Sequence, residues 1–270
     1  MHFKRKLGWK RQPQDERDFK MRHFKMMESV PTVLPPVVNL RRYCSEIQDQ
    51  GELGSCTANA WAGMMQYNLN RNWDADPSHR YFDFSRLFIY YNERVLGGTV
   101  GEDSGAYLRD GAKALATWGA PPEYTWPYFI NNFAVKPLDT VFKLAYNYHI
   151  HSYYNLDSKY EDKQLNNLKQ CIAAGHPFVF GFIVFDSFET PEVARTGIMP
   201  MPNTRTESIQ GGHAVMGVGY NDYEKRFLIR NSWGKGWGLK GNNAGYFTMP
   251  YEFISKKEFA SDFWTLIKND

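Results

Sequence analysis

The sequence lacks any apolar run of about 18 residues, the length that a helix needs to cross a bilayer, so no membrane span is predicted. Its opening residues, MHFKRKLGWK, also lack the apolar core of a signal peptide. Cysteine is scarce, with only 3 in 270 residues, and this odd count argues against a disulfide framework. These absences favour a cytoplasmic or non-classically exported protein, and the compartment stays open because export by a specialised system leaves the same pattern.

The charge is small overall but unevenly distributed. The formal net charge is +3, yet residues 1–30 carry nine Lys and Arg against four Asp and Glu, so residues 31–270 carry −2. Basic stretches are usually solvated rather than bound to nucleic acid. We therefore expect no nucleic-acid partner, and we interpret residues 1–30 as a basic extension or short prosegment that docks on the body.

The chain divides into a helical and a β-rich part after an extended linker, VPTVLPP, at residues 30–36. Helical periodicity covers about 57–71, 85–96 with Ser85 as the N-cap, and 107–118, which predicts a helical lobe over about 40–135. Short β-branched and aromatic runs then predict a β-rich lobe over about 140–260, with one helix near 162–174. They are YNYHIHSYY, PFVFGFIVF, HAVMGVGY, RFLIRNSW, GYFTMP and FWTLI. Strands that follow helices without strict alternation indicate an α+β domain over 31–270.

Cys56 in QDQGELGSCTANAW stands where a helical pattern begins. The first turn of a helix offers unpaired N–H groups and the positive end of its dipole, which favour a thiolate. Most free cysteines are simply small buried hydrophobes, so this position alone does not establish a nucleophile.

A nucleophilic cysteine needs a base and a group that orients the base. QGGHAVMGVGY places His213 after two glycines at the start of a strand-like run, and IRNSWGKGWG places Asn231 at the end of another. Two adjacent strands that end together would bring these side chains within hydrogen-bonding distance.

Taken together, Gln50-x5-Cys56, Gly212-His213-Ala214-Val215 and NSWGKGWG from Asn231 onward resemble the three signature blocks of the papain-like cysteine peptidases. EDSGAYLRDG and ASDFWTL resemble the branch found in bacteria and large DNA viruses, so packaging in a virion is a further possibility for the compartment. The resemblance implies a two-lobe α+β fold, with a helical left lobe, a β-rich, barrel-like right lobe and the active-site cleft between them.

The same resemblance implies the site residues. Cys56 would be the nucleophile, His213 its ion-pair partner, and Asn231 the group that orients His213. Gln50 would donate to the oxyanion together with the backbone N–H of Cys56. Substrate-binding positions would be Gly105, Ala106, Gly212 and Trp233, the last of which would also shield the histidine–asparagine bond from water.

Two near-site residues depart from the family pattern. Leu53 stands where most relatives have a disulfide cysteine, and Thr57 where many have tryptophan. Cys44 and Cys171 do not match the usual disulfide positions, so we predict free thiols, with Cys171 facing the core of a helix.

Other candidate residues give weaker evidence for a functional site. His149 and His151 share one face of an expected strand, but no third ligand follows at a usual spacing, so we interpret them as structural. Glu102 and Asp103 are interpreted as fixing a loop before a helix. No metal or cofactor is expected.

The predicted function is a monomeric cysteine endopeptidase acting on protein or peptide substrates. The alternatives are a papain-fold acyltransferase or isopeptidase, and a catalytically silent binding module. We further predict that residues 1–30 cover the cleft through the anchors Leu7, Trp9, Phe19 and Phe24 and inhibit the enzyme until cleavage near Glu28–Val33. The alternative is a surface strap that only stabilises the body.

Overall fold

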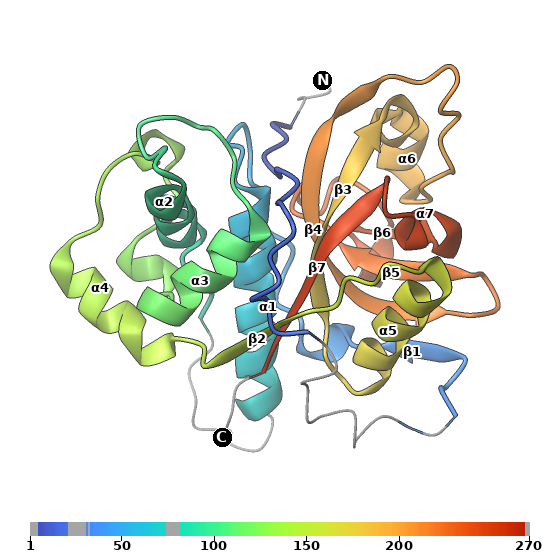
Figure 1. Ribbon diagram of the computed structural model, residues 1–270. Coiled ribbons are helices and arrows are strands. Elements are labelled where there is room, and N and C mark those ends of the chain that lie inside the picture. Colours follow the sequence, from blue (N-terminus) through green and yellow to red (C-terminus); the bar gives the residue numbers. More distant parts are fainter. Residues whose placement is uncertain (1–4, 21–30, 32, 74–81, 268–270) are drawn as a thin grey trace.

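The computed structural model describes residues 5–20, 31, 33–73 and 82–267. Helices gather on one side of a long central helix and a twisted sheet lies on the other (Figure 1). The α-helices are α1 Cys56–Trp73, α2 Arg86–Gly97, α3 Leu108–Trp118, α4 Asp139–Ala145, α5 Glu161–Ala173, α6 Pro191–Thr196 and α7 Tyr251–Ser255. The strands are β1 Val37–Asn39, β2 Ser152–Asn155, β3 Phe178–Phe185, β4 Ile209–Asn221, β5 Arg226–Arg230, β6 Tyr246–Pro250 and β7 Ala260–Ile267.

The helical side consists of α1, α2 and α3, which begin and end within two residues of the predicted bounds. The Ser85 hydroxyl accepts the backbone N–H of Phe88 at 3.1 Å, which confirms the predicted N-cap of α2. Trp61 on α1 is fully buried and donates from its indole nitrogen to the carbonyl of Leu108 at 3.0 Å. This contact ties the start of α3 to the central helix.

The sheet is antiparallel throughout, in the order β2-β7-β3-β4-β5-β6, with β1 added beside β4. Among the described strands this path has two free ends, at β2 and β6, so the sheet is open. The expectation of a barrel-like lobe is corrected in this respect, while the α+β class is confirmed. β4 is 13 residues long and pairs with three strands, so it forms the centre of this side.

Two local predictions were wrong. YNYHIHSYY does not form one strand: β2 begins only at Ser152, after a 3-10 turn at Tyr146–Tyr148. His149 and His151 therefore precede the strand, and the His149 ring stacks on Tyr146. The sequence reading also missed β1, which follows the proline-rich linker and pairs with β4.

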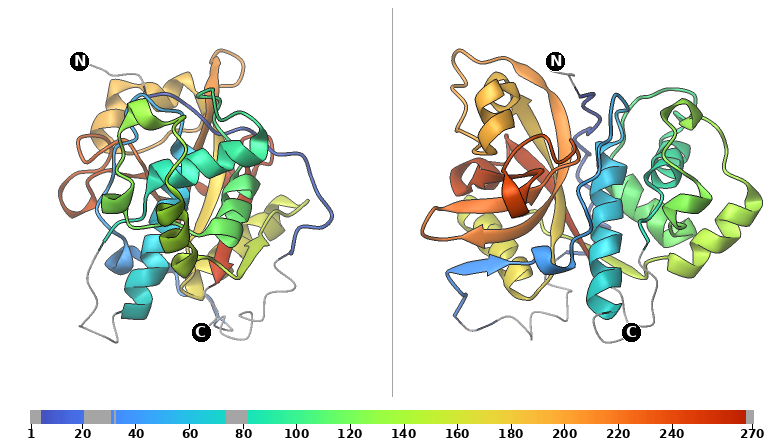
Figure 2. Two further views of the ribbon diagram at one scale, coloured as in Figure 1. Left: turned by 90° about the vertical axis from the view of Figure 1, so that its left-hand side faces the viewer. Right: turned by 180° about the vertical axis from the view of Figure 1, so that it is seen from behind.

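Residues 5–20 pass between the helical and sheet sides, as both views of the fold show (Figures 1 and 2). Trp9 forms a parallel bridge with Ala106, and Lys20 forms another with Asn155. Trp9 is 5% exposed and Leu7 is half-buried, but Phe19 is 63% exposed, so its expected role as an anchor is wrong. Phe24 lies outside the described residues.

Long apolar helices of the kind that span a bilayer do not occur in the described part of the chain.

Arg230 at the end of β5 joins the sheet to the segment that leads toward α1. It is 6% exposed and donates to the carbonyls of Ser45 and Glu46, each at 2.6 Å, and to the Ser45 hydroxyl at 3.0 Å. The same side chain lies against Gly63 of α1, where an added Cβ would come within 3.0 Å of its Nε atom.

We expect Arg230→Met to lower the free energy of unfolding by about 3 kcal/mol, because it leaves several buried acceptors without a donor. Urea unfolding followed by tryptophan fluorescence measures this. Arg195→Met is the control, since the ion pair of Arg195 with Glu192 is largely exposed and contributes little. Equal losses in the two variants would contradict the role given to Arg230.

Candidate active site

Cys56 is the first residue of α1 and is completely buried. The backbone groups of Ala214 on β4, of Gly8 in the N-terminal segment and of Thr57 lie close enough to its sulfur to lower the pKa of the thiol, against the larger effect of burial. The helix start therefore places the thiol against β4, with the N-terminal segment on its outer side.

His213 and Asn231 lie together on the sheet side, and His213 directly precedes Ala214, the β4 residue whose backbone lies close to the thiol. His213 lies inside β4, four residues after the strand begins rather than at its start, and Asn231 directly follows β5. The distance from His213 Nε2 to Asn231 Oδ1 is 2.8 Å, and both residues are buried. The same oxygen accepts the backbone N–H of Ser232 at 2.8 Å, so it faces two donors and the His213 Nε2 carries the proton.

Trp233 covers this pair. Its ring centroid lies 4.8 Å from that of His213, and it is 6% exposed. Phe182 on β3 stands opposite in the register and contacts the imidazole from another side, at 5.7 Å between centroids. The hydrogen bond between His213 and Asn231 is thereby enclosed by aromatic rings.

Gln50 is completely buried and its side-chain amide turns into the site. Its oxygen accepts the Ser232 hydroxyl at 2.7 Å, which fixes the amide so that Nε2 points the other way. Nε2 donates at 3.0 Å to the carbonyl of Leu53 and at 3.0 Å to the carbonyl of Lys6 in the N-terminal segment. The Lys6 carbonyl thus binds the side-chain N–H donor of Gln50 in the site.

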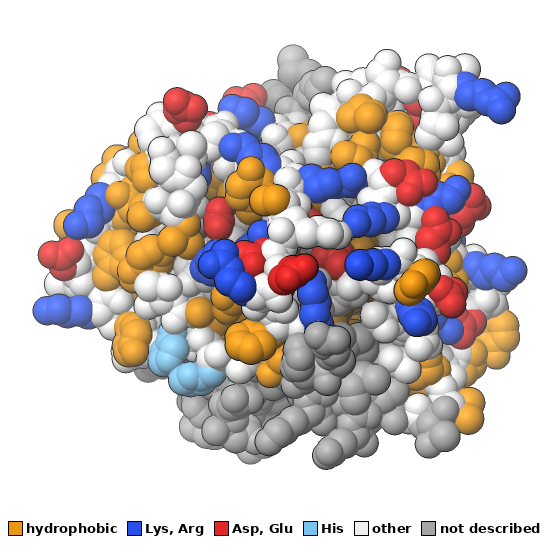
Figure 3. All heavy atoms as spheres, viewed as in Figure 1, with side chains coloured by type: hydrophobic (Ala, Val, Ile, Leu, Met, Phe, Trp, Pro, Cys, Tyr) orange, Lys and Arg blue, Asp and Glu red, His pale blue; other side chains and the backbone are white. Residues whose placement is uncertain are grey.

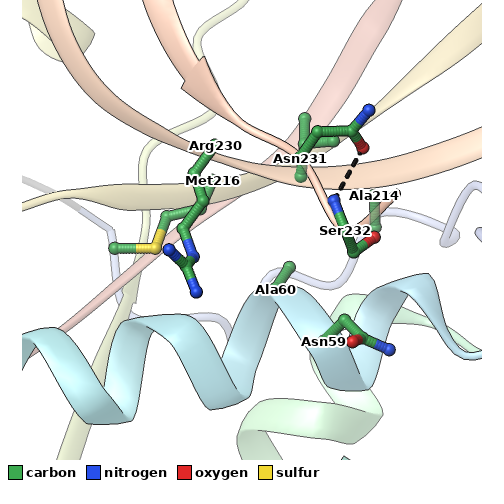
Figure 4. A pocket seen from close by; sticks show the side chains of 8 residues that line it. Asn59, Ala60, Ala214, Met216, Arg230, Asn231 and Ser232 are labelled. Carbon is green, nitrogen blue, oxygen red and sulfur yellow. Dashed lines mark hydrogen bonds between the residues drawn. The ribbon is translucent and has the colours of Figure 1, made fainter. Parts of the chain in front are cut away.

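A small cavity of about 10 Å³ lies next to Asn231, between α1 and the strands β4 and β5 (Figure 4). It is lined by Asn59, Ala60, Ala214, Val215, Met216, Arg230, Asn231 and Ser232. This volume is near the minimum for one water molecule, so this part of the site is closely packed.

Burial controls the protonation of both reactive groups in this arrangement. It raises the pKa of the Cys56 thiol to about 11 and lowers the pKa of the His213 imidazole to about 4, against the opposing effect of the bond from Asn231. Burial thus favours the neutral form of both groups in this structure.

Three of the predicted substrate-binding residues hold the N-terminal segment instead. The Ala106 N–H donates to the carbonyl of Gly8 at 2.9 Å, and its carbonyl accepts the N–H of Lys10 at 3.1 Å. On the other wall, the Gly212 carbonyl accepts the N–H of Trp9 at 3.0 Å. Gly105 has φ +69°, and an added Cβ would come within 2.0 Å of the Gly8 carbonyl oxygen.

The backbone of Gly8 lies equally close to the backbone before α1. A Cβ on this residue would lie 1.8 Å from the carbonyl oxygen of Gly54, which is backbone and cannot move aside. Lys6 and Arg5 flank it with ion pairs to Asp103 at 2.7 Å and Asp49 at 2.6 Å. Asp103 also accepts the N–H of Gly54 at 3.1 Å, so the expected loop-fixing carboxylate additionally binds the segment.

Several residues that matter here escaped the sequence analysis. Gly8 belongs to no motif, and Ser232 and Asp262 were quoted only as parts of NSWGKGWG and ASDFWTL, without a role of their own. Cys44 and Cys171 are both free, and Cys171 is 1% exposed on α5, which confirms its core-facing position.

Comparison with known proteins defines the class. Residues 105–261 match the family model described as papain family cysteine protease, which is more than half of the chain. An uncharacterized peptidase C1-like protein of Acanthamoeba polyphaga mimivirus is 41% identical over 242 residues, covering 86% of this chain and 73% of that protein. The chain therefore belongs to the papain family of cysteine proteases.

Two further proteins show how far the likeness extends. Xylellain, a cysteine protease from Xylella fastidiosa, has a crystal structure with a TM-score of 0.83, 38% identity and full coverage of both chains. The cathepsin L-like proteinase of Fasciola hepatica is 27% identical over 74% of this chain, which spans only 56% of that protein. The resemblance to the branch found in bacteria and large DNA viruses is confirmed.

We expect Cys56 to react slowly with iodoacetamide between about pH 6 and pH 9, because its raised pKa keeps it a buried thiol. Gly8→Ala should accelerate the reaction, since the added Cβ prevents the segment from seating. Mass spectrometry of the labelled peptide measures the rate.

Gly101→Ala is the matched control, because an added Cβ there meets nothing within 4 Å. Labelling of the buried Cys171 reports any general unfolding. Equal Cys56 rates in the Gly8 and Gly101 variants would show that the segment does not protect the thiol.

Proposed function

We propose that this chain hydrolyses peptide bonds through a thiolate–imidazolium pair of Cys56 and His213 and an acyl-enzyme intermediate. The observation that carries the proposal is the enclosed hydrogen bond between His213 and Asn231, together with a cysteine at the start of the helix that packs against β4. A neutral amide suits the Asn231 position, because the imidazolium already has a thiolate partner and needs direction rather than another negative charge.

The chemistry follows from the placement of these groups. The Cys56 thiolate attacks the substrate carbonyl carbon and the carbonyl electrons move to oxygen, giving a tetrahedral oxyanion. His213 then donates its proton to the leaving amine as the C–N bond breaks, leaving a thioester. A water molecule gives its proton to His213 and attacks the thioester, which releases the acid and restores the thiolate.

Gln50 supports this scheme as an oxyanion donor. Its Nε2 already binds a carbonyl oxygen, that of Lys6, and its orientation is fixed by Ser232. A donor that is held in place before the charge develops stabilises the transition state without reorganisation. The substrate backbone would take the positions at Ala106 and Gly212 that the segment now occupies.

We expect Cys56→Ala and His213→Ala to reduce peptide hydrolysis to background, because each removes a group that forms or breaks a bond. Gln50→Ala should lower kcat by about 10²–10³, the usual effect of losing one oxyanion donor. Asn231→Ala should keep partial activity, since only orientation is lost. The assay is hydrolysis of a fluorogenic peptide by chains with the Gly8→Ala background.

The outcomes separate the alternatives. Turnover of Cys56→Ala near that of its parent would exclude the assigned nucleophile. Product appearing mainly as an amide after addition of an amine would favour an acyltransferase, and labelling of Cys56 without any turnover would favour a binding module.

We further propose that residues 5–20 inhibit the enzyme by occupying the site. The segment takes the donor of Gln50, the backbone groups of Ala106 and Gly212, and the outer side of Cys56. Removal by cleavage near residues 28–33 remains a proposal, and residues 28–30 and 32 lie outside the described residues.

Charge holds the segment at three places. Besides the pairs of Arg5 and Lys6, Asp18 accepts from Arg109 of α3 at 2.6 Å, with both side chains less than 10% exposed. Figure 3 shows Lys and Arg side chains gathered across the middle of this face, along the course of the segment. The partly exposed pairs should weaken with salt, while the buried pair should persist.

We expect Gly8→Ala to raise kcat/KM on a small peptide by at least about tenfold, within the range of typical coupling energies. This gain in kcat/KM should be smaller at high salt, because salt also weakens the ion pairs that hold the segment in the chain without the substitution. Initial rates at low and high salt, with active sites titrated, measure this against Gly101→Ala. A folded Gly8→Ala chain with unchanged kcat/KM would leave the segment as a stabilising strap.

A further inference from the structure

The side chain of Trp9 fills a pocket in the wall of the cleft. Its ring lies on Gly181 of β3, where an added Cβ would come within 1.8 Å of the indole, and on Gly212 of β4, where the distance would be 2.6 Å. Any larger residue at these two positions would close the pocket. The glycines therefore leave room for one large side chain next to the strip that binds backbone.

An acidic group forms the inner end of this pocket. Asp262 of β7 is 3% exposed and has φ +61°, an unusual backbone conformation for a residue with a side chain. Its Oδ2 atom accepts the indole N–H of Trp9 at 3.0 Å and the backbone N–H of Gln12 at 3.0 Å. Both donors belong to the N-terminal segment and depart with it.

One acidic and one basic side chain act on Asp262 from neighbouring parts of the chain. Asp157, which precedes α5, lies close enough to raise the pKa of Asp262, and burial is the larger cause, bringing it to about 7. Arg109 faces this carboxyl from α3, and its guanidinium binds Asp18 and the carbonyl of Pro13. Because both partners belong to the N-terminal segment, Arg109 loses them when the segment leaves, and a substrate cation must then compete with Arg109 for Asp262.

We propose that Asp262 determines substrate specificity, selecting peptides that place a basic side chain in the pocket vacated by Trp9. The proposal rests on the proposed function, because it requires the segment to leave and a peptide to follow its path. A buried carboxylate that has lost two donors is unfavourable until a substrate replaces them. A guanidinium or ammonium supplies both the donors and the opposite charge.

Arginine should be preferred to lysine in this pocket. Its planar group presents several donors at once, whereas the ammonium is a point charge that is harder to desolvate. The flat, wide space that the indole occupies suits a planar group. An acidic side chain would meet two carboxyl groups and should be rejected.

The test uses the full chain with Trp9→Ala, which empties the pocket. A positional peptide library identifies the substrate position at which arginine is preferred, and a matched peptide pair then carries arginine or glutamine there. We expect kcat/KM to be about ten- to hundredfold higher for the arginine peptide than for the glutamine peptide, because a hydrogen bond to a charged group contributes a difference of this size. Adding Asp262→Asn should abolish this ratio while changing hydrolysis of the glutamine peptide little.

Glu52→Gln in the same background is the matched control, because it removes an exposed carboxylate from the loop before Cys56. A second measurement does not depend on the folding of the Asp262 variant. In the Trp9→Ala chain, the ratio should fall as the pH is lowered and the carboxyl is protonated.

Each result has a definite meaning. Cleavage without a basic preference, or a preference that survives both Asp262→Asn and low pH, overturns this inference and leaves the proposed peptidase standing. Absence of cleavage for every peptide, in a chain whose circular dichroism matches the parent, overturns both.

Discussion

The packing of α1 against β4 is the contact on which the site depends. The nucleophile candidate comes from the helix and the base candidate from the strand, so neither side of the molecule contains the reactive pair alone. Close approach requires small residues where the two meet, and these are Ala60 and Gly63 on the helix and Ala214 on the strand. Arg230 braces this contact through the segment at Ser45 and Glu46. The aromatic rings around His213 can then exclude water because the backbone behind them is already fixed.

Helices were predictable here because their apolar periodicity and caps are local. The N-cap Ser85 and the glycines that follow α2 and α3 determine where those helices begin and end, without help from distant residues. Strand bounds were less predictable, because pairing partners rather than composition decide them. His149 and His151 match the β pattern of their neighbours, yet pairing with β7 starts only at Ser152. β1 has three residues next to prolines, and only its place beside β4 makes it a strand.

The residues of the candidate site were likewise predictable only in part. Cys56, His213 and Asn231 could be proposed from sequence because each occurs in a distinctive run of residues, although His213 lies inside β4 rather than at its expected start. The residues that bind the N-terminal segment could not, because the decisive contacts are between distant parts of the chain. Trp9 and Asp262 are separated by 253 positions, and nothing local in SDFW indicates that its aspartate faces a tryptophan. The fit of Gly8 against Gly54 likewise exists only once both are placed.

The segment that covers the candidate site belongs to the same chain as the site, and this changes how the proposed inhibition would respond to conditions. A tethered occupant has a local concentration set by the length and stiffness of the connecting chain, on the order of millimolar for a short flexible connection. Dilution of the protein cannot lower that value. Under the proposed inhibition, individually weak contacts, such as three backbone hydrogen bonds and one from an indole N–H, would therefore be enough to keep the segment bound. A free substrate must compete against the tether, and cutting the tether would convert the same segment into a weak, diffusible ligand whose hold depends on how much protein is present.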